Sequence, residues 1–284
     1  MQKYCVLYNP YAASGTGKAS AEKLTSILPD DTLEFKDITK IGDHASFFAS
    51  LDSEQKLIIT GGDGTLNRFI NDTDGIDIPC SVYYFATGTG NDFLNDIGGK
   101  KDDAPFCIDR YIKELPTVTV KGKTYRFING VGYGIDGYCC EVGDQLRETS
   151  DKPVNYTSIA ITGLLFHYKP TNATVIVDGK EYSYKKVWIA PTMKGRFYGG
   201  GMMPTPKQDR MDAERKLSLM VFHGSGKIHT LMVFPSIFKG EHIKHEKIVT
   251  VLEGKEITVK FDQPTALQID GETILGVTEY TAHI

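Results

Sequence analysis

The sequence predicts an α/β protein in which an N-terminal parallel-sheet α/β domain is followed by a C-terminal antiparallel, β-rich domain. Up to about Pro105, short apolar runs alternate with helical patterns, as in a parallel sheet covered by helices. Beyond that residue, extended runs come in pairs around tight turns, which is typical of hairpins. The 284 residues are about twice the commonest domain size. We therefore divide the chain into residues 1–105 and 106–284.

Strands and helices are expected to alternate in the first domain, with the helices on both faces of the sheet. The apolar runs predict strands at Tyr4–Tyr8, Leu33–Ile38, Leu57–Thr60 and Val82–Phe85. Helical patterns cover Ala19–Leu28, Asp43–Leu51 and a segment that begins at Leu66–Asn71. Asp43 is expected to cap the second of these helices.

Hairpins dominate the second domain. The segment "TVTVKGKTYRFI" (117–128) turns at Lys121-Gly122-Lys123, and "ATVIVDGKEYSYKKVWIA" (173–190) turns at Asp178-Gly179, the strongest short hairpin signal. Further extended runs lie at 256–261, 266–269 and 270–274, and helical patterns at 135–146 and 156–166. A C-terminal strand that returns to the first domain is left open.

Composition and charge argue against several classes of function. The formal net charge of −4 argues against nucleic acid as the main partner, because no overall basic balance exists to neutralise phosphates. Five cysteines without a CxxC pair indicate neither a disulfide framework nor a zinc site. The N-terminus is not a signal peptide, and no uncharged apolar run approaches the ~18 residues of a membrane span. We expect a cytoplasmic protein.

The stretch "LIITGGDGTLNRF" (57–69) ends an apolar run in Gly61-Gly62-Asp63-Gly64-Thr65. Such a strand–turn–helix junction lies at the carboxyl edge of a parallel sheet, where open α/β folds bind ligands. Glycines let backbone N–H groups approach phosphate oxygens, and the following helix adds its positive end. Asp63 can hold Mg²⁺ or its waters, and Thr65 adds a hydroxyl donor. A tight turn alone needs only one glycine, so this pattern favours a phosphate-binding loop.

A second glycine loop follows the next expected strand. In "ATGTGNDFLNDIG" (86–98), Gly88 and Gly90 flank Thr89, and Asn91-Asp92 opens a helix. Both loops therefore end strands of one sheet and could border one crevice. Simple helix capping explains Asn91 equally well, and we favour a function for Asp92 because of its neighbours.

Another cluster, Gly132-Tyr-Gly134-Ile-Asp-Gly137, matches the dinucleotide-binding pattern literally. It follows a hairpin instead of opening a βαβ unit. We interpret it as a close-packed turn.

Taken together, Gly61–Thr65, the run Gly88–Phe93 and Asp270-Gly271-Glu272 resemble the diacylglycerol kinase catalytic family, which comprises soluble bacterial lipid kinases and the related sphingosine and ceramide kinases. The opening "NPYAASGTGK" (9–18) is similar to the family's Asn-Pro…Ser-Gly start. The segment "INGVGYGIDG" (128–137) is similar to the strand and turn that open its second domain. The resemblance covers essentially the whole chain and is most specific over 57–94.

The resemblance implies an ATP- and Mg²⁺-dependent lipid kinase whose active site lies in the cleft between two domains. The acceptor is a lipid alcohol, with diacylglycerol first among the candidates. The catalytic base is implied within the 270–272 turn, with Asp270 as the first choice and Glu272 as the alternative, beside Asp63. The implied nucleotide-contacting residues are Asn9, Thr39, Gly61, Gly62, Asp63, Gly64, Thr65, Asn67, Gly88, Thr89, Asn91 and Asp92. Asp63 and Asp92 are the implied ligands of the active-site metal.

Two departures from the family pattern concern metals. Relatives carry an Asp-Asp-Gly-Leu-Leu-Asp-like stretch that binds a structural Mg²⁺. The equivalent here is "MDAERKLSL" (211–219), which offers Glu214 and the carbonyls of Met211 and Lys216, with Ser218 at the last aspartate. Because Arg215 and Lys216 oppose a divalent cation, we expect weak or no Mg²⁺ there. In addition, some relatives carry an acid near the start of the second domain that joins the active-site metal network. The equivalent segment here, Leu115-Pro116-Thr117, contains no acid.

Two other functions remain as alternatives. NAD kinase shares a Gly-Gly-Asp-Gly-Thr turn and a two-domain plan, although we would expect a Gly/Leu-rich run where this chain has Asn91-Asp92-Phe93. A non-catalytic nucleotide-binding protein on the same fold is the second alternative, given the missing metal acids. The intact Asp63 and Asp270 argue against it.

A lipid substrate implies transient contact with the inner face of the membrane. The best basic segment is 180–196, "KEYSYKKVWIAPTMKGR", with Lys180, Lys185, Lys186, Lys194 and Arg196 around the only tryptophan, Trp188. Burial of Trp188 in the core is at least as well supported by the strand pattern. Residues 158–166, "SIAITGLLF", are a candidate wall for an acyl chain or an ordinary core helix. A homodimer is left open.

Overall fold

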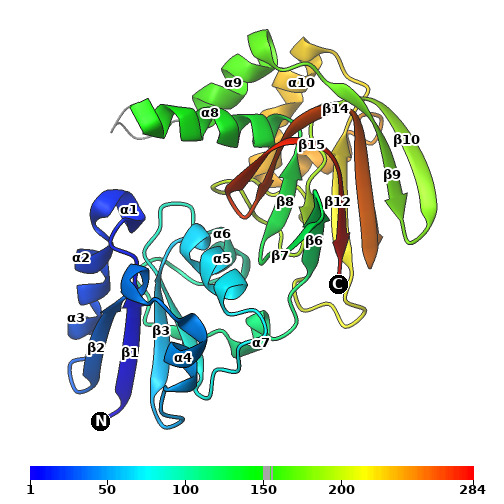
Figure 1. Ribbon diagram of the computed structural model, residues 1–284. Helices are drawn as coiled ribbons and strands as arrows, with labels where there is room; N and C mark the ends of the chain where they lie inside the picture. Colours follow the sequence, from blue (N-terminus) through cyan, green and yellow to red (C-terminus); the bar gives the residue numbers. More distant parts are fainter. Residues whose placement is uncertain (150–153, 155) are drawn as a thin grey trace. The chain divides into compact units, whose positions relative to one another are not determined.

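Two separate sheets organise the chain (Figure 1). The computed structural model describes residues 1–149, 154 and 156–284, which divide into a first unit, Met1–Leu115, and a second unit, Pro116–Ile284. The predicted fold class is confirmed, because the first sheet is mostly parallel and the second is antiparallel.

The first unit contains a five-stranded sheet in the order β2-β1-β3-β4-β5. The first four strands pair in parallel, and β5 adds an antiparallel edge. The strands are β1 (Lys3–Tyr8), β2 (Thr32–Asp37), β3 (Lys56–Gly61), β4 (Val82–Ala86) and β5 (Phe106–Cys107). The helices are α1 (Ala12–Gly15), α2 (Gly17–Glu22), α3 (Leu24–Ile27), η1 (Ile38–Lys40), α4 (His44–Ala49), α5 (Asp63–Asp72), α6 (Asp92–Asp96) and α7 (Asp109–Ile112).

Both faces of this sheet are buried, as a parallel sheet requires. Alternate residues of β1 point to opposite faces, and Tyr4, Cys5, Val6 and Leu7 are all buried. The predicted cap of α4 is also confirmed, because the Asp43 side chain accepts a hydrogen bond from the Ser46 N–H. The unit extends to Leu115 because β5 pairs with β4 and α7 follows directly.

The second unit is built on a ten-stranded antiparallel sheet whose main path is β13-β12-β11-β8-β14-β15-β6-β7, with β9 and β10 attached through β14. The predicted hairpins at 117–128 and 173–190 are confirmed as β6–β7 and β9–β10. The strands are β6 (Thr117–Val120), β7 (Lys123–Arg126), β8 (Gly130–Tyr133), β9 (Thr171–Val177), β10 (Lys180–Val187), β11 (Thr192–Met193), β12 (Leu217–Phe222), β13 (Val249–Gly254), β14 (Glu256–Ile269) and β15 (Glu272–His283). The final strand, β15, pairs with β14 and β6 inside this unit.

Helices gather at one end of the second unit (Figure 1). They are α8 (Ile135–Thr149), α9 (Tyr156–Thr162), the π-helix η2 (Gly163–His167), α10 (Lys227–Val233) and the 3₁₀ helices η3 (Phe234–Lys239) and η4 (Glu241–Lys244). Helix α8 packs on β14 and β15, and α10 contacts η2. The second unit thus has a sheet core and a helical end.

Candidate functional site

The Gly61–Thr65 loop joins β3 to α5 at the carboxyl end of the parallel strands. Gly62 is the N-cap position of α5, and Asp63 is its first residue, so the helix begins three residues earlier than Leu66, where the sequence pattern placed it. A Cβ on Gly61 would lie 2.4 Å from the Thr65 side chain, so Gly61 is required by packing. A Cβ on Gly64 would meet no atom within 4 Å. Packing therefore does not explain Gly64, and its bare backbone leaves the start of α5 accessible.

Asp63 ties this loop to the second glycine loop. Its carboxylate accepts hydrogen bonds from the backbone N–H groups of Asp92, at 2.8 Å, and Phe93, at 2.9 Å. These two residues begin α6, so Asp63 acts as a cap for that helix from 29 residues away in the sequence. The carboxylate that the sequence assigned to metal binding thus has a structural role, and its contact with a metal ion stays a prediction.

The two glycine loops are also in direct backbone contact. A Cβ on Gly88 would lie 2.5 Å from the Cα of Gly62, so neither position tolerates a larger residue without a shift. Asn91, which precedes α6, has a left-handed backbone, with φ of 51°, and its Nδ2 donates to the Gly88 carbonyl. Asn91 Oδ1 is buried and has no hydrogen-bond partner among the described residues. The predicted convergence of the two loops on one edge of the sheet is therefore observed.

Four other predicted nucleotide-contacting residues also lie in the first unit. Asn9 follows β1 and accepts a hydrogen bond from the Tyr11 N–H through its side chain. Thr39 lies in η1, where its hydroxyl donates to Asp37 at 2.6 Å. Asn67 is buried on α5, and Thr89 is exposed at the tip of the second loop. The structure places all four in the first unit, and their contact with a nucleotide stays a prediction.

Asp270 occupies the turn between β14 and β15, in a left-handed conformation with φ of 47°. Its buried carboxylate accepts three backbone hydrogen bonds, from the N–H groups of Ile128 at 2.6 Å and of Asn129 and Gly130 at 2.9 Å. Glu272, the first residue of β15, is exposed. The two candidate bases therefore differ sharply in environment.

A buried arginine supports the same backbone segment from another direction. Arg210 Nη1 donates to the Ile128 carbonyl, and Nη2 donates to Asn129 Oδ1 at 3.0 Å. Lys194 lies close by, and burial, together with the positive charges of Arg210 and Arg215, lowers its pKa. Sequence reasoning assigned no role to Asn129 or Arg210, because their contacts join segments 81 or more residues apart.

The glycine motif at 132–137 packs against the strand that leads to Asp270. A Cβ on Gly137 would lie 2.0 Å from the Ala266 carbonyl, and one on Gly132 would lie 1.6 Å from the Asp136 carboxylate. The expected close-packed turn is confirmed. It also holds an acid that sequence reasoning passed over, because burial raises the pKa of Asp136 to about 6.

Asp136 is connected to the Asp270 turn through one side chain. Gln268 Nε2 donates to the Asp136 carboxylate at 3.2 Å, and Gln268 Oε1 accepts from the Gly271 N–H at 2.6 Å. The start of α8 is thereby linked to the turn that carries both candidate bases.

The segment expected to correspond to a structural metal site is closed by the chain's own groups. The Glu214 carboxylate pairs with the Lys216 ammonium, and the Lys216 carbonyl accepts from Gln208 Nε2 at 3.0 Å. The Ser218 hydroxyl donates to Gln208 Oε1. In the described part of the chain, no three His, Cys, Asp or Glu side chains gather as a metal site would need. Glu214 and the Lys216 carbonyl thus have partners within the chain, and weak or absent Mg²⁺ binding at this segment stays a prediction.

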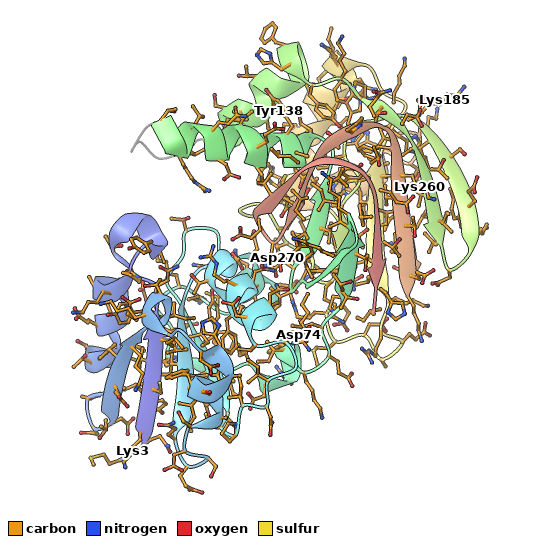
Figure 2. The ribbon with its side chains drawn as sticks, viewed as in Figure 1. Lys3, Asp74, Tyr138, Lys185, Lys260 and Asp270 are labelled. Atoms are coloured by element: carbon orange, nitrogen blue, oxygen red, sulfur yellow. The ribbon has the colours of Figure 1, made fainter. Side chains whose placement is uncertain are left out.

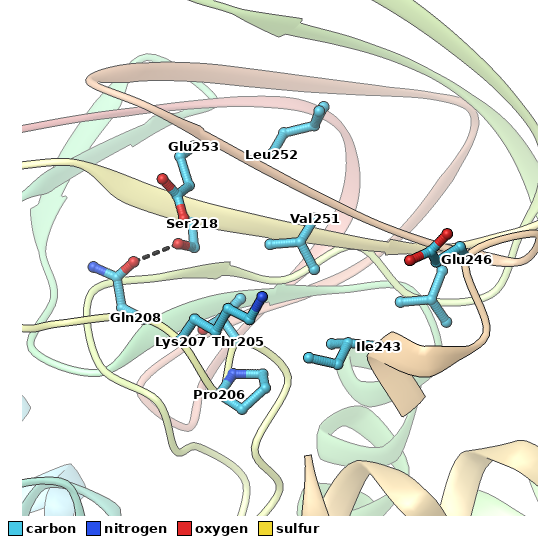
Figure 3. A pocket seen from close by; sticks show the side chains of 11 residues that line it. Thr205, Pro206, Lys207, Gln208, Ser218, Ile243, Glu246, Val251, Leu252 and Glu253 are labelled. Atoms are coloured by element: carbon cyan, nitrogen blue, oxygen red, sulfur yellow. Dashed lines mark hydrogen bonds between the residues drawn. The ribbon is translucent and has the colours of Figure 1, made fainter. Parts of the chain in front are cut away.

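An open cavity of about 470 Å³ lies beside this segment (Figure 3). Its lining mixes apolar side chains of β13 and η4 with charged ones and includes Gln208 and Ser218, but none of the candidate catalytic residues. The cavity and the candidate chemistry are therefore separate.

The structure removes two residues from the basic segment predicted for membrane contact. Trp188 is 1% exposed, and its indole N–H donates to the Ser225 carbonyl at 3.1 Å, so it cannot lie at a membrane surface. Lys194 is buried as well. Lys180, Lys185 and Lys186 remain exposed on β10. Among the described residues, no helix is both long and apolar enough to cross a membrane.

Comparison with known families assigns both units. Residues 3–121 match the diacylglycerol kinase catalytic domain, and residues 129–282, more than half of the chain, match the YegS C-terminal NAD kinase beta sandwich-like domain. The chain belongs to the diacylglycerol kinase catalytic family. The resemblance read from the sequence is confirmed, and the chain is thus a member of a lipid kinase family.

Individual relatives agree with this assignment. The chain is 24% identical over 260 residues to a protein named diacylglycerol kinase from Mycobacterium tuberculosis (strain ATCC 25618 / H37Rv), a match that covers 87% of the chain and 82% of the relative. The solved structure of a diacylglycerol kinase from Bacillus anthracis (strain Sterne) covers 99% of the chain and is itself covered to 93%, with a TM-score of 0.59 and 18% identity. The structural likeness supports the fold.

Proposed function

We propose that the protein is an ATP-dependent lipid kinase that transfers the γ-phosphate of ATP to the hydroxyl of diacylglycerol. One observation carries the proposal. In a chain of this family, the Gly61–Thr65 loop is intact and its Asp63 carboxylate holds the second glycine loop in place. Phosphoryl transfer requires mainly positioning and charge stabilisation, and a rigid pair of backbone loops can supply both.

The start of α5 is the proposed phosphate site. Gly64 is exposed, has an ordinary backbone conformation and has open space where a side chain would be. A glycine costs helix stability relative to alanine, so its presence in the first turn needs another reason. An approaching phosphate is such a reason, since the N–H groups of a helix start bind anions.

Asp63 and Asp92 are the proposed ligands of a Mg²⁺ ion that accompanies ATP. They are adjacent because the Asp92 N–H binds the Asp63 carboxylate. Mg²⁺ bound with ATP usually takes only one or two carboxylates from the protein, so this pair suffices. When bound, the ion would neutralise charge on the phosphate oxygens. Asp63 then performs two tasks, because it also fixes the start of α6.

On the acceptor side, the geometry favours Glu272 over Asp270 as the group that takes the hydroxyl proton. Asp270 is buried, and three of the about four acceptor positions of its carboxylate already bind N–H donors, which leaves little capacity for a substrate hydroxyl. Glu272 is exposed on the same turn and can reach a substrate. Asp270 is then a positioning residue that fixes the turn, reversing the order of preference taken from the family resemblance.

Measured ADP release tests the proposal. The purified chain is supplied with ATP, Mg²⁺ and one acceptor at a time: diacylglycerol in detergent micelles, a sphingoid base, NAD, or none. We expect acceptor-dependent ADP release with diacylglycerol, and its loss in Asp63→Ala. Release with NAD alone would instead support an NAD kinase-like activity. ATP binding without release for any acceptor would support a non-catalytic nucleotide-binding protein.

A further inference from the structure

A line of exposed apolar side chains runs along α10 and η3 in the second unit. Ile228 is 74% exposed, Met232 69% and Phe238 42%. Residues four apart in an α-helix and three apart in a 3₁₀ helix share a face, so Ile228, Met232, exposed Pro235 and Phe238 follow one side of the two consecutive helices. We call these four residues the apolar stripe. Phe166, 73% exposed, lies on η2, which α10 contacts.

The helices that carry the apolar stripe are anchored in the core of the second unit. On the opposite side of the same helices, Thr230, Val233, Phe234 and Ile237 are buried. The loop before α10 is fixed as well, because the Trp188 indole N–H donates to the Ser225 carbonyl. The helices are therefore held firmly by one face while the other presents large apolar groups to solvent. Contiguous exposed apolar side chains of this kind mark an interaction surface.

Basic residues outnumber acids around the stripe, and the next acid in the sequence, Glu241, is paired with Lys244. Residues 223–240, "HGSGKIHTLMVFPSIFKG", contain Lys227 and Lys239 and no Asp or Glu, although the whole chain has a net charge of −4. The residues of η2 and its flanks, 156–169, also contain no acid. Lys185 and Lys186 lie next to the start of α10, because the Gly224 N–H donates to both of their backbone carbonyls.

Three of these four lysines, Lys185, Lys186 and Lys239, are available to a ligand. Among the residues that the structure describes, Lys185, Lys186 and Lys239 form no salt bridge. The first two are exposed at the end of β10, where Lys185 is labelled in Figure 2. An apolar strip with lysines beside it matches the surface of a bilayer, which offers acyl chains below a layer of phosphates.

We propose that the apolar stripe and its flanking lysines are the face through which this chain docks on an anionic lipid bilayer. The proposal rests on the proposed lipid kinase function, since a diacylglycerol acceptor resides in a membrane. Trp188 and Lys194, which the sequence suggested for membrane contact, are buried. The side chains that insert into the bilayer are instead Ile228, Met232 and Phe238. The lysines bind lipid phosphates and counteract the repulsion from the chain's net negative charge.

Charge argues against a second copy of the chain as the occupant. A twofold dimer through this face would bring the same lysines of both copies together, and the next acid in the sequence, Glu241, is already paired with Lys244 of its own chain. Like charges across an interface oppose association. A bilayer rich in anionic lipid has no such conflict.

The test measures binding apart from catalysis. The full chain, without ATP, is co-sedimented with phosphatidylcholine vesicles and with vesicles that also contain phosphatidylglycerol. We expect the wild-type chain to bind the anionic vesicles more tightly. Ile228→Glu combined with Met232→Glu should reduce the bound fraction by about tenfold or more on both vesicle types, because two carboxylates would enter the apolar layer. Ile228→Gln with Met232→Gln should give a smaller loss in the same direction.

Lysine reversal separates the electrostatic part. Lys185→Glu with Lys186→Glu should weaken binding to the anionic vesicles only, and added salt should remove the difference from wild type. Two matched controls should bind as wild type does. Val251→Glu adds a carboxylate at an exposed apolar residue of β13, and Lys100→Glu with Lys101→Glu reverses an exposed lysine pair in the first unit.

Three results would overturn the proposal. Wild-type protein could fail to sediment with either vesicle, the stripe variants could bind as wild type does, or the wild type could prove to be a dimer that the stripe variants convert to a monomer. The last result would make the stripe a self-association surface. Failure of the lipid kinase function is distinguishable, because it would abolish ADP release with every lipid while leaving the pattern of vesicle binding unchanged.

Discussion

Replacing Asp270 with asparagine separates its structural from its chemical role. Asparagine has nearly the same shape and tolerates the left-handed backbone observed at this position, so the turn itself does not oppose the change. One carboxylate oxygen accepts the N–H groups of Asn129 and Gly130, and the other accepts that of Ile128. Asparagine has one side-chain oxygen, so it can accept the N–H groups on only one side of the former carboxylate. Its NH₂ group would face an N–H donor on the other side.

The expected cost follows from these three bonds. Hydrogen bonds to a charged group contribute about 1.5–3 kcal/mol each, against about 1 kcal/mol for neutral pairs. Losing one bond and neutralising two others predicts a loss of about 3–5 kcal/mol in the free energy of unfolding of the second unit. For a unit of this size, about 2–4 °C of Tm corresponds to each kcal/mol, so a decrease of roughly 6–20 °C is expected.

Thermal unfolding followed by circular dichroism measures this decrease, and ADP release measures activity at a temperature where the variant is folded. Glu272→Gln is the matched control, because an exposed side chain changes stability by less than about 0.5 kcal/mol. We expect Glu272→Gln to unfold at the wild-type Tm and to have a much lower kcat than the wild type. If Asp270→Asn instead keeps the wild-type Tm and loses all activity, the carboxylate acts on the substrate, and Asp270 rather than Glu272 is the base.

Three further predictions address other parts of the molecule. Gly64→Ala should leave stability unchanged or raise it by up to about 1 kcal/mol, while KM for ATP rises at least about tenfold; unchanged kinetics would remove the phosphate from the start of α5. Because burial raises the pKa of Asp136 to about 6, the folded state binds its proton more tightly than the unfolded state, and stability should fall as pH rises from about 4 to 6. Asp136→Asn should abolish this part of the decline, which a comparison of chemical denaturation curves at several pH values would show. Finally, EDTA should leave Tm unchanged although the proposed activity would require Mg²⁺, because Gln208 binds the Lys216 carbonyl and the Lys216 ammonium pairs with Glu214; a clear decrease in Tm would show a structural metal ion.

Local patterns predicted most of the secondary structure. Strand–helix alternation, the two-residue hairpin turns and the Asp43 cap depend on neighbouring residues, and the structure agrees with each of them. The glycine pattern at 132–137 was likewise interpreted correctly as close packing. These features follow from interactions within a few residues, which a single sequence displays directly.

The long-range contacts of the candidate site could not be predicted in the same way. Asp63 binds the start of a helix 29 residues further on, and Asp270 binds N–H groups more than 140 residues before it. The sequence singled out both residues, but nothing near them in the sequence indicates which donors their carboxylates meet. Trp188 illustrates a second limit, since a basic neighbourhood and a buried strand position predicted opposite locations for it.

The burial of Trp188 makes the chain's single tryptophan a reporter of one half of the molecule. It lies in the core of the second unit, among Tyr168, Ile189 and Phe222, whereas the first unit contains no tryptophan. Its fluorescence emission should therefore shift to longer wavelength only when the second unit unfolds. Far-ultraviolet circular dichroism detects both units. Denaturation curves from the two signals will coincide if the units unfold together and separate if the first unit unfolds on its own.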